Sequence, residues 1–209
     1  MSATFPPRPS HHCIWLPRSA VWLDLRDPDY SLVEGFEFPY AMRNCVRFSG
    51  NLPGDVTVAE ANLLVHSMFV ADIVEHTLGI IDRKMIRTAL MHDAHEIVCQ
   101  DVSRPAKIAM RDPLTTMLGG KSDYDKFEEN HKRALAARFD LYYPHPSDVA
   151  EADALALAWE MTTWFGPEWY QAEGMTCGRP LGLDTAVGCR PYAGIVSFMK
   201  RLGEPLMPS

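Results

Sequence analysis

The segment MIRTALMHDAHEIV, residues 85–98, places His92, Asp93, His95 and Glu96 inside a pattern of apolar residues that predicts a helix. Asp82 is suited to cap the start of that helix. Apolar residues recur at the spacing of one buried helical face, at Met85, Ile86, Ala89, Leu90 and Ile97. Packing against a core gives no reason for two histidines and two acids within positions 92–96. Because Glu96 lies four residues after His92, the two side chains share a face of the predicted helix.

Further helices are predicted on both sides of this segment. A capping box at Thr57 and Glu60 favours a helix that starts at Thr57 and stops near Gly79. Other helical patterns cover Ser122–Phe139, Ser147 to about Trp164 and about Tyr192–Leu202, and shorter ones lie around Leu32–Cys45 and Ala106–Met110. Strand signals are weak everywhere. We therefore expect an all-α protein with an irregular N-terminal segment and a Gly- and Pro-rich C-terminal tail.

The overall composition excludes several classes of protein. Of the 209 residues, 47% are hydrophobic and 22% are charged, which is typical of a soluble globular chain. The formal net charge of −7 argues against a general nucleic-acid-binding surface, which needs a basic face. The five cysteines contain no CxxC pair, so neither a disulfide framework nor a zinc ribbon is indicated. No apolar run approaches the ~20 residues of a membrane span, and we expect a cytoplasmic protein with no membrane partner.

Candidate metal ligands come from three of the predicted helices. His92 and Asp93 offer a nitrogen and an oxygen side by side, a pair suited to Mn, Co, Zn or Fe. His66 is isolated in an apolar helix, and Asp153 lies in the most apolar part of a later one. Taken singly, His66 also fits a hydrogen-bonded core histidine, and Asp153 fits a first-turn residue that complements the helix dipole. Together the four residues make a ligand set with room for water.

The order of these motifs resembles that of a known family. The stretches VRFSG (46–50), VHSMFVADIV (65–74), ALMHDAHEIVCQDVSRPAK (89–107) and EADALALAWE (151–160) are similar to motifs of the HD-domain phosphohydrolase superfamily. Within it, the resemblance is to bacterial HD-type 5'-deoxynucleotidases and to phage HD-domain dNTP triphosphohydrolases that act on dATP. Val65 departs from the pattern, because Glu or Gln often precedes the first histidine.

The resemblance also implies an organisation and a metal site. It covers about Arg43–Glu160, and it implies an HD-domain helical bundle formed as one domain over residues 1–209. The core would span about 43–165, with extensions at 1–42 and 166–209. A divalent metal ion, with Co, Mn, Zn and Mg as the candidates, would be held by His66, His92, Asp93 and Asp153.

Further roles follow from the same match. Glu96 would position the attacking water or exchange protons around it, and Asp101 would assist near the phosphate. Arg47 would bind the substrate, with Phe48 beside it at a position where some members have tryptophan, and Lys107 suits the phosphate. In an acidic chain, Arg104 is a further candidate cation for the phosphoryl oxygens, because developing negative charge there needs a fixed positive partner.

The expected function is metal-dependent hydrolysis of a deoxynucleotide. Metal-activated water would attack a phosphate of a deoxynucleoside 5'-monophosphate or triphosphate, and the choice between the two stays open. The substrate partner would be a nucleotide rather than a nucleic-acid polymer, and the family implies a homo-oligomer, a dimer or higher. The alternative is a catalytically inactive HD scaffold that binds a nucleotide or a protein partner. A P-loop is excluded at LGGKS (118–122), because Thr115 stands where that motif needs glycine.

Overall fold

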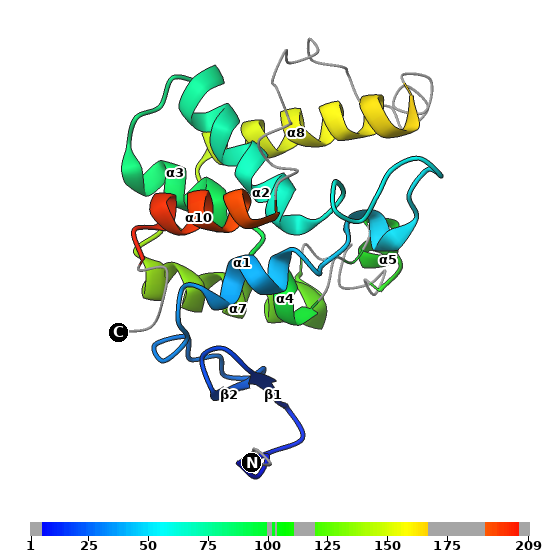
Figure 1. Ribbon diagram of the computed structural model, residues 1–209. Coiled ribbons are helices and arrows are strands. Elements are labelled where there is room, and N and C mark those ends of the chain that lie inside the picture. The colour runs from blue at the N-terminus through cyan, green and yellow to red at the C-terminus, as the bar shows by residue number, and fades with distance from the viewer. Residues whose placement is uncertain (1–5, 100–101, 103, 111–119, 167–190, 205–209) are drawn as a thin grey trace.

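Helices predominate in the computed structural model, which describes residues 6–99, 102, 104–110, 120–166 and 191–204, with the backbone alone for 104, 105 and 191–193. The chain forms, in order, β1 (Cys13–Leu16), β2 (Val21–Asp24), α1 (Glu37–Met42), the 3-10 turn η1 (Arg47–Gly50), α2 (Leu63–Asp72), the π-helical turn η2 (Ile73–Thr77), α3 (Arg83–Met91), α4 (Glu96–Cys99), α5 (Arg104–Ala109), α7 (Asp123–Phe139), α8 (Ser147–Phe165) and α10 (Pro191–Leu202). The prediction of a mainly helical chain is therefore confirmed (Figure 1).

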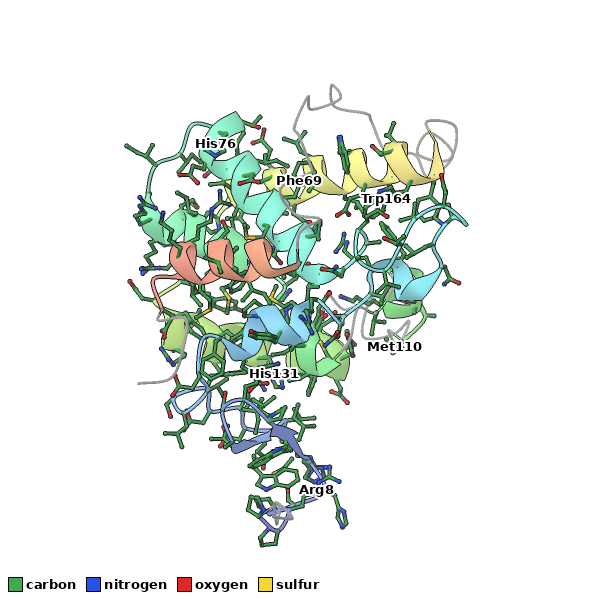
Figure 2. All side chains as sticks on the ribbon, in the orientation of Figure 1. Arg8, Phe69, His76, Met110, His131 and Trp164 are labelled. Atoms are coloured by element: carbon green, nitrogen blue, oxygen red, sulfur yellow. The ribbon has the colours of Figure 1, made fainter. Side chains whose placement is uncertain are left out.

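Helix α2 lies at the centre of the arrangement and contacts α3, α8 and α10. Phe69 of α2 packs against Trp159 of α8, with ring centroids 5.2 Å apart (Figure 2). The apolar cluster around these helices runs from Leu16 in β1 to Leu202 in α10. Segments expected as extensions of the core thus contribute to it, and α10 packs on α1 and α3.

The start of α2 differs from the prediction. The Thr57 backbone N–H donates to the Glu60 carboxylate, which is one half of a capping box, but the Glu60 backbone N–H donates to the Thr57 carbonyl oxygen and not to the hydroxyl, so the pair closes only a turn. The helix begins at Leu63, where the Asn62 side chain accepts a hydrogen bond from the backbone N–H of Val65. The capping prediction at Thr57 was wrong because Asn62 also fits an N-cap, and it lies directly before the continuous apolar run.

The later helices agree closely with the sequence. Ser122 caps α7 in a capping box with Asp125, and the helix runs to Phe139 as predicted. Helix α8 ends one residue beyond the expected Trp164, and α10 begins one residue before the expected Tyr192. Asp82 caps α3 by accepting from the Lys84 backbone N–H. Strong local signals therefore fixed these boundaries.

The N-terminal segment contains a hairpin that the sequence did not predict. Strands β1 and β2 pair antiparallel, with Cys13 opposite Asp24 and Leu16 opposite Val21. Each strand has only four residues, which is too short for the alternation of apolar and polar residues to be recognised. The helix expected around Leu32–Cys45 is also shorter, because only Glu37–Met42 is helical. Among the described helices, none has both the length and the apolar character that crossing a bilayer requires.

Candidate metal centre

The polar cluster at positions 92–96 lies at a break between two helices. Helix α3 ends at Met91, and the backbone N–H groups of Ala94 and Glu96 donate three residues back, to Met91 and Asp93. The prediction of one continuous helix here was wrong, because these bonds form a turn before α4 begins at Glu96. The turn lets two consecutive side chains face the same point, and His92 Nε2 lies 3.1 Å from Asp93 Oδ2. A continuous helix would separate neighbouring residues by about 100°.

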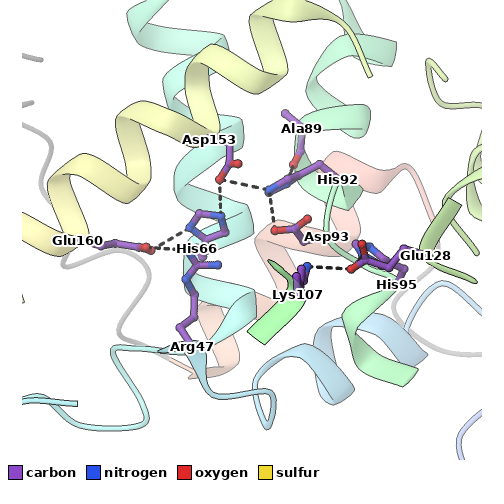
Figure 3. Close-up of polar contacts among 10 residues, drawn as sticks. All are labelled: Arg47, His66, Ala89, His92, Asp93, His95, Lys107, Glu128, Asp153 and Glu160. Carbon is purple, nitrogen blue, oxygen red and sulfur yellow. Dashed lines mark hydrogen bonds and ion pairs between the residues drawn. The ribbon is translucent and has the colours of Figure 1, made fainter. Parts of the chain in front are cut away.

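The four predicted ligands converge at this turn from three directions (Figure 3). His66 projects from α2, Asp153 from α8, and His92 and Asp93 from the end of α3. His66 Nε2 lies 3.1 Å from Asp153 Oδ1, and His92 Nε2 lies 3.6 Å from the same oxygen. One ligand atom from each of the four residues lies within 4.8 Å of the other three. The set could therefore hold a metal ion, and Asp153, with 41% of its side chain exposed, borders the solvent.

Hydrogen bonds fix which nitrogen of each imidazole faces the centre. The Nδ1 of His92 lies 2.8 Å from the carbonyl oxygen of Ala89, which can only accept, so Nδ1–H is the donor. In the same way, Nδ1–H of His66 donates to the carboxylate of Glu160 at 2.9 Å. A neutral imidazole protonated at Nδ1 carries its lone pair on Nε2. Both lone pairs thus point at carboxylate oxygens.

This arrangement fits a cation. The Nε2 atoms of His66 and His92 are buried, and neither has a hydrogen-bond partner among the described residues despite the nearby carboxylates. The lone pairs of the two nitrogens and the negative carboxylate oxygens repel one another unless a positive charge lies between them. A divalent ion between these atoms would satisfy both nitrogens and balance the two negative charges. Nitrogen with carboxylate ligands suits Zn, Mn or Co.

The electrostatics of the four residues agree with that reading. Burial by itself lowers the pKa of His92, but the carboxylates of Asp93 and Asp153 outweigh it and hold the pKa well above 6.5. Burial likewise opposes the charge on Asp93, yet His92 holds the pKa of that carboxyl well below its usual range. The pKa of Asp153 is also lowered, because the nearby imidazoles of His66 and His92 outweigh burial. In the absence of a metal ion, the carboxylates therefore favour protonation of the two imidazoles.

Metal binding should consequently strengthen as the pH rises. The pKa values of His66 and His92 are both raised above 6.5 in the metal-free protein, so a metal ion must displace protons from Nε2. We expect the affinity for Zn²⁺ to increase as the pH rises above about 6.5, and to level off once both imidazoles are neutral. Calorimetric titration in two buffers of different ionisation enthalpy would measure the protons released. A proton release near zero between pH 6 and 7 would contradict this expectation.

Glu160 is a part of the centre that the sequence did not identify. Its Oε1 accepts from His66, and its Oε2 accepts from Arg47 at 2.9 Å. Burial raises the pKa of Glu160, but Arg47 and His66 outweigh it and keep the carboxyl ionised. Arg47, predicted to bind substrate, is itself buried in this ion pair. A glutamate on the buried face of an apolar helix was the available signal, because such a residue needs a partner.

Lys107 lies on the other side of the centre, beside Asp93 (Figure 3). Its Nζ is 2.8 Å from Oε1 of Glu128, and the same oxygen lies 3.3 Å from Nε2 of His95. His95 is fully buried. The hydrogen bonds from His95 and Lys107 outweigh burial and hold the pKa of Glu128 at about 2. Glu128 thus keeps the Lys107 ammonium at the edge of the metal ligands.

The structure describes some of the other predicted site residues fully and others only in part or not at all. Glu96 is buried at the start of α4, and its carboxylate lies within 4.8 Å of ligand atoms of Asp93 and His95. Phe48 has a positive φ of 56° and packs edge-to-face with Phe165, with ring centroids 5.3 Å apart. Asp101 lies outside the described residues. Arg104 is the first residue of α5, and its side chain also lies outside the described part of the chain.

Comparison of the sequence with protein-family models and with curated proteins gives no match. The function is therefore inferred from the sequence motifs and from the geometry of the four candidate ligands.

Proposed function

We propose that this chain is a metal-dependent phosphohydrolase of the HD-domain class that acts on deoxynucleotides. The observation that carries the proposal is the convergence of two buried imidazole Nε2 atoms with the carboxylates of Asp93 and Asp153. His66 lies on α2, His92 and Asp93 lie in the turn after α3, and Asp153 lies on α8, in the order His, His-Asp, Asp that the resemblance implies. A purely structural cluster would satisfy these nitrogens with protein donors or acceptors.

The residues around the ligands have separable tasks in this proposal. A divalent ion bound by the four ligands would lower the pKa of its water from ~15.7 towards ~7. Glu96, next to Asp93, would accept or return a proton of the attacking water. Lys107, held by Glu128, would neutralise charge that develops on the phosphoryl oxygens. Asp101 would assist near the phosphate, as the resemblance implies, and Arg104 would be a further cation for the phosphoryl oxygens.

A panel assay of the purified protein tests this proposal. Each deoxynucleoside mono- and triphosphate would be paired with Mn²⁺, Co²⁺, Mg²⁺ and Zn²⁺, with phosphate, pyrophosphate and triphosphate detected separately. Phosphate from monophosphates alone would identify a 5'-deoxynucleotidase, and triphosphate from dATP or another dNTP would identify a triphosphohydrolase. No product from any pair, with metal present in the protein, would reject the proposal and favour an inactive scaffold that binds nucleotide.

We also propose, from the resemblance, that the protein acts in the cytoplasm as a dimer or a higher homo-oligomer. Sedimentation equilibrium over a range of protein concentrations tests the oligomeric state. A monomer mass at every concentration would contradict it.

Lys107→Met is expected to weaken the use of the substrate while leaving the metal centre intact. The ammonium group is not among the metal ligands, but it lies beside Asp93. Loss of one hydrogen bond from a charged donor, about 1.5–3 kcal/mol, corresponds to a decrease in kcat/KM of roughly 10–150-fold. Steady-state kinetics and metal titration would measure the two effects separately. Lys126→Met, which removes an exposed lysine paired with Asp123, is the matched control. Equal kinetics for both variants would show that Lys107 has no role in binding or hydrolysing the substrate.

A further inference from the structure

The buried carboxylate of Glu160 connects two residues that the proposed function uses separately. Only 2% of the residue is exposed, and its two oxygens serve different partners. Oε1 accepts from His66, whose other nitrogen faces the candidate metal position, while Oε2 accepts from Arg47. Such a carboxylate loses its hydration on folding, so both contacts are needed to compensate for it.

Glu160 also shares a helix with a candidate ligand. It follows Asp153 by seven residues on α8, which is about two turns, so both side chains lie on one face of the helix. Asp153 contacts Nε2 of His66, and Glu160 contacts Nδ1 of the same ring. One rigid helix therefore holds the imidazole at both of its nitrogens, which fixes the orientation of the ring.

We propose that Glu160 is a positioning residue that prepares His66 to bind the metal ion. This inference rests on the metal centre of the proposed function and deepens it. By accepting a hydrogen bond from Nδ1–H, the carboxylate keeps the lone pair on Nε2 and increases its basicity. Arg47 holds the second oxygen, so the carboxylate cannot turn away from the ring. The same carboxylate thereby links the metal position to a residue predicted to bind substrate.

Glu160→Gln tests the inference by metal affinity, which does not depend on finding the substrate. Glutamine keeps the shape of the side chain but removes the charge that polarises His66. We expect the Kd for Zn²⁺, measured by competition with a chromophoric chelator, to increase about 10–100-fold. The visible absorption of bound Co²⁺ should change as well, because it reports the ligand field. Glu151→Gln, the same change at an exposed position of α8, should leave both measurements unchanged.

A second variant guards against loss of folding, since Glu160→Gln leaves Arg47 buried without its carboxylate. In the double variant R47M/E160M, both members of the ion pair are replaced by apolar side chains of similar size, a change that proteins often tolerate. It should fold and bind Zn²⁺ as weakly as the single variant. Wild-type Zn²⁺ affinity in either folded variant would overturn the inference. Wild-type protein that binds Zn²⁺ but hydrolyses no nucleotide would reject the proposed function alone.

Nuclear magnetic resonance of the wild-type protein tests the role of Glu160 without any variant. With ¹¹³Cd²⁺ as the probe and ¹⁵N-labelled histidine, the Nε2 of His66 should show coupling to cadmium. Its Nδ1 should keep a proton that exchanges slowly, because the acceptor is a buried carboxylate. Coupling of cadmium to Nδ1, or rapid exchange of that proton, would overturn the assignment of Glu160.

Discussion

His92→Ala is expected to remove both metal binding and hydrolysis while the helical content is retained. The imidazole is one of four ligands, and its Nε2 lies near carboxylate oxygens of both Asp93 and Asp153. Without it, two acids and one histidine remain, and the affinity for Zn²⁺ should decrease by more than the roughly 10–100-fold that the loss of an outer hydrogen bond costs. Chelator competition, the panel assay and far-ultraviolet circular dichroism would measure the three quantities.

The His92 variant also has a thermal signature. Metal at 100 times its Kd adds about 2.7 kcal/mol to the free energy of unfolding, so Zn²⁺ should raise the melting temperature of the wild type but not of the variant. His76→Ala is the control, because that side chain is 59% exposed in η2 and is not one of the four candidate ligands. Metal-dependent turnover retained by His92→Ala would reject the ligand assignment.

Glu96→Gln is expected to separate chemistry from metal binding. The carboxylate adjoins Asp93 but lies outside the set of His66, His92, Asp93 and Asp153. Loss of a positioned general base or acid typically costs 10²–10⁴-fold in rate, so kcat should decrease by about that amount while the Kd for Zn²⁺ stays within about twofold. Titration with metal and steady-state kinetics on the same preparation would establish the contrast with His92→Ala.

Two outcomes would contradict the role of Glu96. Normal turnover in Glu96→Gln would make it a structural acid that stabilises the start of α4. A large loss of metal affinity would place it among the ligands instead. Because glutamine preserves the size of this buried side chain, the comparison is not confused by a cavity.

Much of the fold was predictable because its signals are local. Ser122 with Asp125, and Asp82 with Lys84, satisfy helix ends through residues two or three positions apart, so short stretches of sequence determine where α7 and α3 begin. The candidate ligands were predictable for a related reason. An isolated histidine or aspartate in an apolar helix, such as His66 or Asp153, is costly there unless something binds it.

The sequence failed where two signals of similar strength competed, or where the pattern was too short. Thr57 and Asn62 are both capable helix caps, and only the packing of the apolar run that starts at Leu63 decided between them. The apolar periodicity continues from Leu90 to Ile97, so it concealed the turn at His92. That turn is what brings His92 and Asp93 to one point.

By itself, the sequence determined the helical class, the bounds of α7, α8 and α10 to within one residue, and the four residues that could hold a metal ion. Only the tertiary structure decided how these residues are supported. Glu160 contacts His66, which lies 94 residues away in the sequence, and Glu128 contacts Lys107, which lies 21 residues away. Spacing along a chain predicts contacts within a helix, because the helix repeats every 3.6 residues. Contacts between helices depend on how whole faces pack, which no local pattern specifies.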